Sequence, residues 1–155
     1  MKIVFLILFS FISLGSHAEE LFTPIKPFTS DECSKWPEGN ILDKDLWKEC
    51  CYEHDLAYWL GGTRKERRKA DEDLMKCVAK EGDPLNGALM WVGTRVGGRP
   101  YYPTPFRWGY GWSHERAYSP LNEKEIDSAK QELSNVNDEI ALKAAEKYFS
   151  KLKPI

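Results

Sequence analysis

The sequence predicts a mainly α-helical domain. Apolar residues recur at steps of three and four over three stretches, at about 45–60, 63–78 and 123–150, and this spacing is typical of helices with one buried face. The chain also has 4 cysteines, which can clamp the first helix from two sides. With 155 residues it can bury about two-thirds of its unfolded surface, so the cysteines reinforce a hydrophobic core.

Residues 1–18 are predicted to be a secretory signal peptide. An apolar run of 12 residues follows Lys2, and small residues precede a cleavage position after Ala18. A membrane anchor is the weaker reading, because a helix needs about 20 apolar residues to span a bilayer. We therefore expect a single domain over residues 19–155, in a secreted or periplasmic protein whose cysteines form disulfides.

The charge balance argues against a nucleic-acid-binding protein. There are 22 Lys and Arg residues against 24 Asp and Glu residues, which gives a formal net charge of −2. A basic run near residue 65 could meet anionic headgroups, but Glu66 interrupts it and a solvated helix face is the stronger interpretation. This run consists of Arg64, Lys65, Arg67, Arg68 and Lys69.

Three prolines before residue 40 predict an extended or looped start of the domain. A helix is expected next, over about 45–60, and the Gly61-Gly62 pair ends it. Thr63 then begins a second helix, because its side chain can cap the new amino terminus and Glu66 completes a capping box. The inward positions of the second helix are Ala70, Asp71, Leu74, Cys77 and Val78. Two antiparallel helices follow from such a short turn.

The register of this hairpin brings His54 close to Asp71. His54 lies seven to eight residues before the centre of the turn and Asp71 nine to ten after it. A mismatch of about two residues corresponds to roughly 3 Å along the helix axes, so the two side chains can meet. Functional use is the stronger interpretation of His54, which also has Asp55 beside it, whereas His114 has no partner at a telling spacing and is expected at the surface.

The same register selects one of three disulfide connectivities. A vicinal pair such as Cys50 and Cys51 cannot easily bond to itself, so each sulfur is expected to reach a different partner. Cys50 shares a helix face with His54, which makes Cys77 its natural partner, and Cys51 is left for Cys33. The pairs Cys33-Cys51 and Cys50-Cys77 would hold the histidine rigidly.

Residues 85–121 are expected to be irregular, because glycines, prolines and aromatic residues replace the helical pattern. Packing of the rings over the helices is favoured over an amphipathic surface for lipid. A long helix is then predicted over 123–150, capped by Asn122 and Glu125, with acids at its start and lysines at its end. This helix is expected to pack on the core, and the protein to be a monomer.

Over about Cys33 to Val78 the chain resembles the secreted phospholipase A2 family. The active-site helix of that family carries Cys-Cys-x-x-His-Asp, as residues 50–55 do here. Its second long helix carries an aspartate six residues before a cysteine, a spacing that Asp71 and Cys77 keep. The resemblance implies a divergent, bacterial-type member, with a phospholipase A2-like core of two disulfide-linked antiparallel helices over about 33–80.

This resemblance also implies roles for individual residues. His54 would be the general base that activates water against a glycerophospholipid acyl ester, and Asp71 would orient its imidazole. Tyr58 would support Asp71 through a hydrogen bond. Asp55 would bind Ca²⁺, which would polarise the ester carbonyl at a phospholipid or membrane surface.

The calcium loop departs from the family pattern. The family usually follows its loop cysteine with Gly-x-Gly, whereas Cys33 is followed by Ser-Lys-Trp-Pro-Glu-Gly. We expect the backbone carbonyls of Trp36, Glu38 and Gly39 to complete the calcium shell of Asp55. The alternative is a noncatalytic module of the same fold that binds lipid, the cell envelope or a protein. A hydrolase with His54 and Asp55 as joint metal ligands is weaker, because adjacent helical side chains point about 100 degrees apart.

Overall fold

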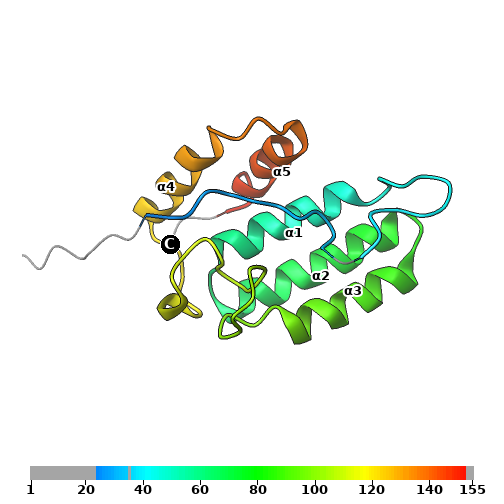
Figure 1. The fold of residues 1–155 in the computed structure, drawn as a ribbon, viewed down its shortest axis with the longest axis horizontal. Coiled ribbons are helices and arrows are strands. Elements are labelled where there is room, and N and C mark those ends of the chain that lie inside the picture. The colour runs from blue at the N-terminus through cyan, green and yellow to red at the C-terminus, as the bar shows by residue number, and fades with distance from the viewer. Residues whose placement is uncertain (1–23, 35, 153–155) are drawn as a thin grey trace, which may run out of the picture.

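The computed structural model describes residues 24–34 and 36–152, so the predicted signal peptide at 1–18 lies outside the described residues. The part described is mainly α-helical, as expected. Its elements are α1 (Lys48–Leu60), α2 (Arg64–Lys80), α3 (Pro84–Gly97), the short 3-10 helix η1 (His114–Arg116), α4 (Glu123–Leu133) and α5 (Glu139–Phe149) (Figure 1). None of these helices is long and apolar enough to cross a membrane.

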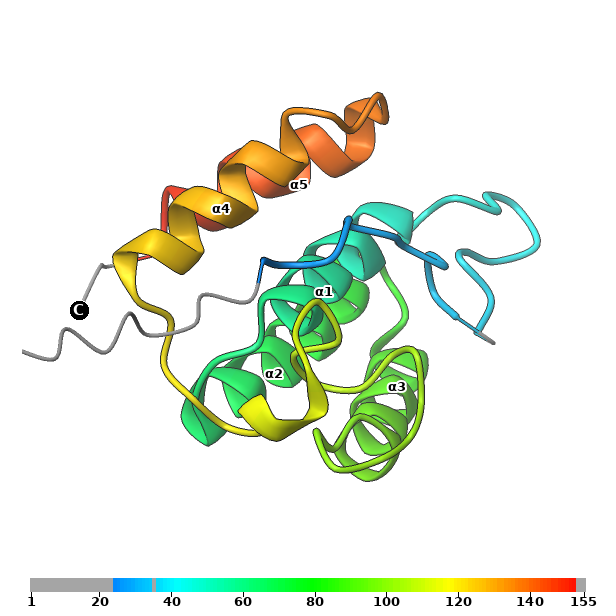
Figure 2. The same cartoon turned by 60° about the vertical axis from the view of Figure 1, so that its left-hand side comes forward.

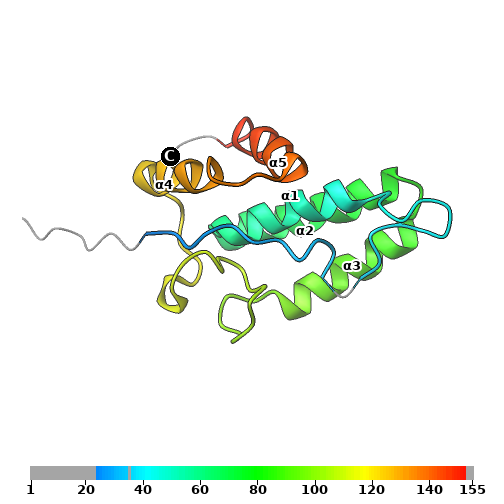
Figure 3. The same cartoon turned by 45° about the horizontal axis from the view of Figure 1, so that its top comes forward.

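α1 is the central helix. α2 packs antiparallel to it on one side, and α3 lies beyond α2, while α4 and α5 form a hairpin on the opposite side of α1 (Figures 1 and 3). One cluster of buried residues joins α1 to the α4–α5 hairpin, and includes Leu56, Trp59 and Leu60 of α1. A second cluster joins α1 to α2 and α3 around the cysteines. Residues on two faces of α1 are therefore fixed by packing, which suits a helix that holds a site.

The turn between α1 and α2 has the predicted glycine at the end of α1 and the predicted cap at the start of α2. Gly61 adopts a φ of 70°, a left-handed conformation that favours glycine, and its N–H donates to the carbonyl of Ala57. Thr63 and Glu66 form the predicted capping box at the start of α2. The helices over 45–60 and 63–78 are therefore confirmed, with slightly different ends.

The prediction that residues 85–121 are irregular is wrong for their first third, which forms α3. Asp83 caps this helix by accepting from the N–H of Asn86, and Pro84 occupies the first turn, where its missing N–H costs nothing. Gly87 lets α3 approach α2 closely, since a Cβ there would lie 2.6 Å from the carbonyl oxygen of Met75. Gly87 thus serves packing, and Gly93 lies within the helix without stopping it.

The single long helix predicted over 123–150 is also wrong. Residues 134–138 break it into α4 and α5, which fold back on each other (Figure 1). Asn135 and Asn137 are poor helix formers within this break, and Asp138 begins α5 by accepting from the N–H groups of Ile140 and Ala141. Three alanines bury one face of α5 against the core, at Ala141, Ala144 and Ala145.

The rest of the aromatic segment caps α1. The N–H of Gly109 donates to the carbonyl of Tyr58 at 2.6 Å, and the indole of Trp112 donates to that of Leu60 at 2.7 Å. The last carbonyls of a helix have no partners within it, so this segment satisfies groups that would otherwise be buried without hydrogen bonds. Trp108 and Trp112 are buried, in keeping with the packing interpretation for these two rings.

Candidate active site

His54 and Tyr58 point from α1 at the same carboxylate of α2. Nε2 of His54 lies 3.0 Å from Oδ1 of Asp71, and the Tyr58 hydroxyl donates to that oxygen at 2.7 Å. The two residues are four positions apart on α1, so they share a face, and all three side chains are buried. The structure thus brings together the three residues that the sequence grouped as a catalytic set.

Asp71 has a third partner from α3. Nη1 of Arg95 donates to its other oxygen, Oδ2, at 2.7 Å. Burial alone would raise the pKa of Asp71, but the hydrogen bonds from His54, Tyr58 and Arg95 outweigh burial and lower the pKa below its ordinary value. Asp71 is therefore a carboxylate that accepts, and Nε2 of His54 carries the proton that it receives.

A buried arginine of α2, Arg67, supports the hydrogen-bond network around Asp71. Arg67 donates from Nε to the Tyr58 hydroxyl at 3.1 Å, and from Nη2 to the carbonyls of Thr94 and Arg95 at 2.7 and 3.0 Å. A further bond from Nη1 reaches the hydroxyl of Tyr118. Arg67 therefore fastens the carboxyl-terminal end of α3 to the site.

The interpretation of residues 64–69 as a solvated face is wrong for Arg67. This side chain is 2% exposed, whereas its basic neighbours are exposed. Its position four residues before Asp71 was the available signal, because that spacing puts both on the inward face of α2. No sequence signal pointed to Arg95, since α3 itself was not predicted.

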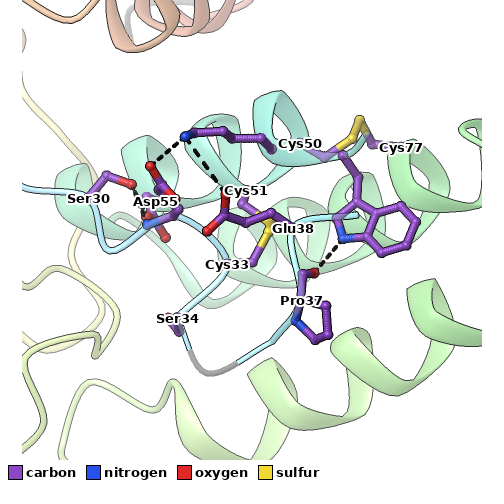
Figure 4. The surroundings of a disulfide bond; sticks show 12 residues. Ser30, Cys33, Ser34, Pro37, Glu38, Cys50, Cys51, Asp55 and Cys77 are labelled. Carbon is purple, nitrogen blue, oxygen red and sulfur yellow. Dashed lines mark hydrogen bonds and ion pairs between the residues drawn. A yellow bond between two sulfur atoms is a disulfide. The ribbon is translucent and has the colours of Figure 1, made fainter. Parts of the chain in front are cut away.

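Asp55 faces a different environment from His54. Its carboxylate accepts from the Ser30 hydroxyl at 2.6 Å, and Ser30 lies against it in Figure 4. Burial is the main cause that raises the pKa of Asp55 to about 8, and the nearby acids Asp31 and Glu32 add to it, while the Ser30 bond opposes them. A cation bound at the Asp55 carboxylate would offset the repulsion from Asp31 and Glu32.

Of the three residues expected to complete the calcium shell, only Trp36 lies at the pocket that contains Asp55. The Glu38 carbonyl accepts from the Trp47 N–H at 2.9 Å, and a Cβ on Gly39 would meet the backbone of Asp43 at 2.0 Å. Trp36 lines the pocket beside Asp55, whereas Glu38 and Gly39 do not. Residues 29–34 line the pocket with Asp55 instead.

The donor groups near Asp55 are of the type that a hard cation prefers. They are the carboxylate of Asp55, the Ser30 hydroxyl that donates to it, and the carboxylate of Asp31, whose charge acts on Asp55. Within the described residues no three His, Cys, Asp or Glu side chains come close enough to hold a metal ion. Backbone carbonyls of residues 29–34 would therefore have to supply much of a calcium shell.

Two disulfides hold these parts in place, with the predicted pairing. Cys33 is joined to Cys51 and Cys50 to Cys77. Figure 4 shows the first bond tying the loop of residues 29–34 to α1, beside Asp55, and the second tying α1 to α2. The vicinal cysteines thus join α1, close to His54 and Asp55, to the loop of residues 29–34 and to α2.

A pocket of about 460 Å³ opens beside the network. His54 and Asp55 both line it, and apolar side chains form much of the remaining wall, including Leu74, Met90 and Phe106. His114 lies outside this pocket, exposed as expected, with Nε2 3.0 Å from the carbonyl of Tyr102. A polar pair at the edge of an apolar pocket is a common arrangement for a small-molecule site.

Comparison of the chain with family models, with curated proteins and with solved structures finds no match. The resemblance to secreted phospholipases A2 consequently stands on the residues of the site alone.

Proposed function

We propose that the protein is a secreted, calcium-dependent hydrolase of the phospholipase A2 type, which cleaves an acyl ester of a glycerophospholipid. The observation that supports this most is the buried His54-Asp71 pair at the edge of an apolar pocket that Asp55 shares. An ester with a long acyl chain needs a basic group beside an apolar wall, and this pocket offers both.

In this proposal His54 acts through Nδ1. Because Nε2 donates to Asp71, Nδ1 is the nitrogen left to accept a proton from water as it attacks the ester carbonyl. The attack forms a tetrahedral oxyanion, and the imidazolium then returns the proton to the departing alcohol oxygen. Asp71 holds the ring and stabilises its positive charge, and Tyr58 and Arg95 hold Asp71.

Charge on the oxyanion needs its own stabiliser. Ca²⁺ held by Asp55, with oxygens of residues 29–34, would supply this as a Lewis acid. The residues near Asp55 fit such an ion by donor type, as described above.

The second candidate is a noncatalytic module of the same fold that binds lipid, the cell envelope or a protein. The observation that favours it is the Glu38 carbonyl, which accepts from the Trp47 N–H and belongs to a residue outside the pocket that Asp55 lines. In that case the apolar pocket would hold a ligand that is not cleaved.

Fatty-acid release from mixed phospholipid vesicles tests the two candidates. The purified protein should release fatty acid with calcium and not with a chelator, and His54→Ala should abolish release, while His114→Ala should not. Absence of release by a folded protein, with no rise in its melting temperature on adding calcium, would contradict the hydrolase and favour the module.

A further inference from the structure

The outer face of α3 is apolar and exposed. Four residues spaced by four, three and four positions lie along one side of the helix, with exposed fractions of 70% for Leu85, 46% for Leu89, 51% for Val92 and 61% for Val96. We call these four residues the α3 face. A surface helix ordinarily turns polar residues to solvent, so this face is unusual for a soluble domain.

The α3 face also lacks charge. Arg95 is the single charged residue of α3, and its guanidinium points inward to Asp71. Charged residues make up 30% of the chain, so an uncharged stretch of this length on the surface is a local departure. α3 lies at the outer edge of the fold, away from the α4–α5 hairpin (Figure 2).

Exposed aromatic residues follow α3 along the chain. They are Tyr101, Tyr102 and Phe106, and each is at least 37% exposed. Tyrosines combine an apolar ring with a polar hydroxyl, which suits the boundary between lipid headgroups and acyl chains.

The pocket opens beside the α3 face. Gly93 is exposed between Val92 and Val96, and it also lines the pocket. Phe106 likewise lines the pocket and is exposed. A bilayer lying on the α3 face would therefore meet the opening that leads to His54.

Cations border this surface at the carboxyl-terminal end of α3. Arg64 and Arg68 share the face of α2 with Met75, whose carbonyl oxygen lies beside Gly87 of α3. Tyr118, which Arg64 approaches, packs on the exposed Tyr101, with ring centroids 6.0 Å apart. The Arg64 guanidinium lies 5.1 Å from the ring centroid of Tyr118. Within the described part of the chain, neither arginine has a carboxylate partner within 4.0 Å. Guanidinium groups that have no carboxylate partner, beside an apolar face, complement a bilayer with anionic headgroups and an apolar interior.

We infer that the α3 face, bordered by Arg64 and Arg68, docks on an anionic phospholipid bilayer. The inference rests on the proposed function for the substrate, and it adds the surface through which the bilayer is met. Insertion of the α3 face places the pocket opening against the lipid, while the arginines contact the phosphates. The other possible occupant is a second copy of the chain.

Sedimentation with vesicles tests this inference. In the presence of chelator, the wild type should bind phosphatidylglycerol vesicles and bind phosphatidylcholine vesicles more weakly. The double variant Val92→Glu/Val96→Glu should bind at least about tenfold more weakly, because two charges would enter the apolar region. Arg64→Gln/Arg68→Gln should reduce binding to the anionic vesicles only.

Leu142→Glu is the matched control, since Leu142 is 40% exposed on α5, on the other side of the molecule. This control should bind as the wild type does, and melting curves should show that all variants fold. Unchanged vesicle binding by the Val92/Val96 double variant, or no binding by the wild type, would overturn the inference. A wild-type dimer in analytical ultracentrifugation that the double variant converts to a monomer would also overturn it, in favour of a second copy.

A soluble substrate separates this inference from the proposed function. The double variant should hydrolyse a monomeric short-chain phosphatidylcholine at the wild-type rate, because the α3 face does not include His54 or Asp71. Wild-type vesicle binding without hydrolysis of either substrate would contradict the proposed function and leave the docking surface in place.

Discussion

Asp71 is the residue at which three helices meet. It lies on α2, it accepts from His54 and Tyr58 of α1, and it accepts from Arg95 of α3. Because the side chain is fully buried, each of these bonds replaces one to water, and losing any of them leaves a buried polar group unpaired. The carboxylate that would orient His54 therefore also holds α3, which forms part of the pocket wall.

Protonation of Asp71 should weaken the fold at acid pH. Its pKa is lowered in the folded protein, and in an unfolded chain it is about 3.9, so the stabilisation is complete above that pH and is lost as the pH falls through the folded value. We expect Asp71→Asn to be less stable than the wild type by about 1–3 kcal/mol at neutral pH, with the difference shrinking in acid. Urea unfolding at several pH values measures this.

Asp73→Asn is the control for this prediction. Asp73 lies on the same helix, is half-exposed and pairs with Lys69, so its stability difference should stay small at every pH. A deficit of Asp71→Asn that does not change between neutral and acid pH would contradict the role given to its charge.

Arg67 should contribute more to stability than any neighbouring basic residue. Replacing it by methionine removes a donor from the Tyr58 hydroxyl and from two carbonyls of α3, of which that of Thr94 keeps the N–H of Gly98. We expect a loss of about 3–5 kcal/mol in the free energy of unfolding. Arg68→Met, at the next position but exposed, should change it by less than about 0.5 kcal/mol. Chemical denaturation compares the two, and equal losses would contradict the buried role.

At the scale of elements, local sequence signals predicted the α1–α2 hairpin and its register. Capping residues, a glycine turn and a steady apolar spacing all agreed there, and the meeting of His54 with Asp71 followed from helix geometry. α3 was missed because its glycines match loop composition, although Gly87 serves close packing. Close contact between helices is a tertiary property that single-sequence patterns do not contain.

The break between α4 and α5 shows the opposite error. The apolar spacing continues through residues 134–138, so periodicity alone predicted one helix. Local hydrogen bonding decided otherwise, since Asp138 caps α5 and its other oxygen accepts from the hydroxyl of Tyr52 on α1. The turn is thus held by a partner 86 positions away in sequence, which no local pattern reveals.

The end of α1 should tolerate no side chain at Gly61. A Cβ there would lie 2.8 Å from the Cα of Gly109, and φ is +70°, so Gly61→Ala combines backbone strain with a clash. We expect a loss of about 1–3 kcal/mol in the free energy of unfolding. Gly93→Ala in the middle of α3 is the contrast, because nothing lies within 4 Å of its Cβ, and it should gain about 0.5–1 kcal/mol. Thermal melts of the two variants should therefore shift in opposite directions, and a loss in both would contradict this account.

At the scale of the whole molecule, α1 carries the site and the rest of the fold fixes α1. The α4–α5 hairpin holds its outer face through buried contacts and through ion pairs from Lys143 and Lys147 to Glu49 and Glu53. The disulfides hold its inner face. Of these constraints, the bond from Cys33 to Cys51 is the one that reaches the loop beside Asp55.

The two disulfides should consequently differ in what their removal does to calcium binding. Each double variant, Cys33→Ala/Cys51→Ala and Cys50→Ala/Cys77→Ala, should lose about 2–4 kcal/mol of stability, because each opens a closed loop of the chain. Calcium should raise the melting temperature of the wild type, since an ion that binds only the folded state stabilises it.

That rise should become much smaller in the Cys33/Cys51 variant, because residues 29–34 then lose their covalent tie to α1 and keep noncovalent contacts such as the Ser30–Asp55 hydrogen bond. It should persist in the Cys50/Cys77 variant. Calorimetry with added calcium distinguishes the two, and magnesium serves as the control ion because it demands a tighter octahedral shell than a flexible loop provides. An equal calcium response in both variants would mean that the loop does not hold the ion. Asp55 would then bind no calcium in the way proposed, the oxyanion would lack its stabiliser, and the noncatalytic module would become the better account of the pocket.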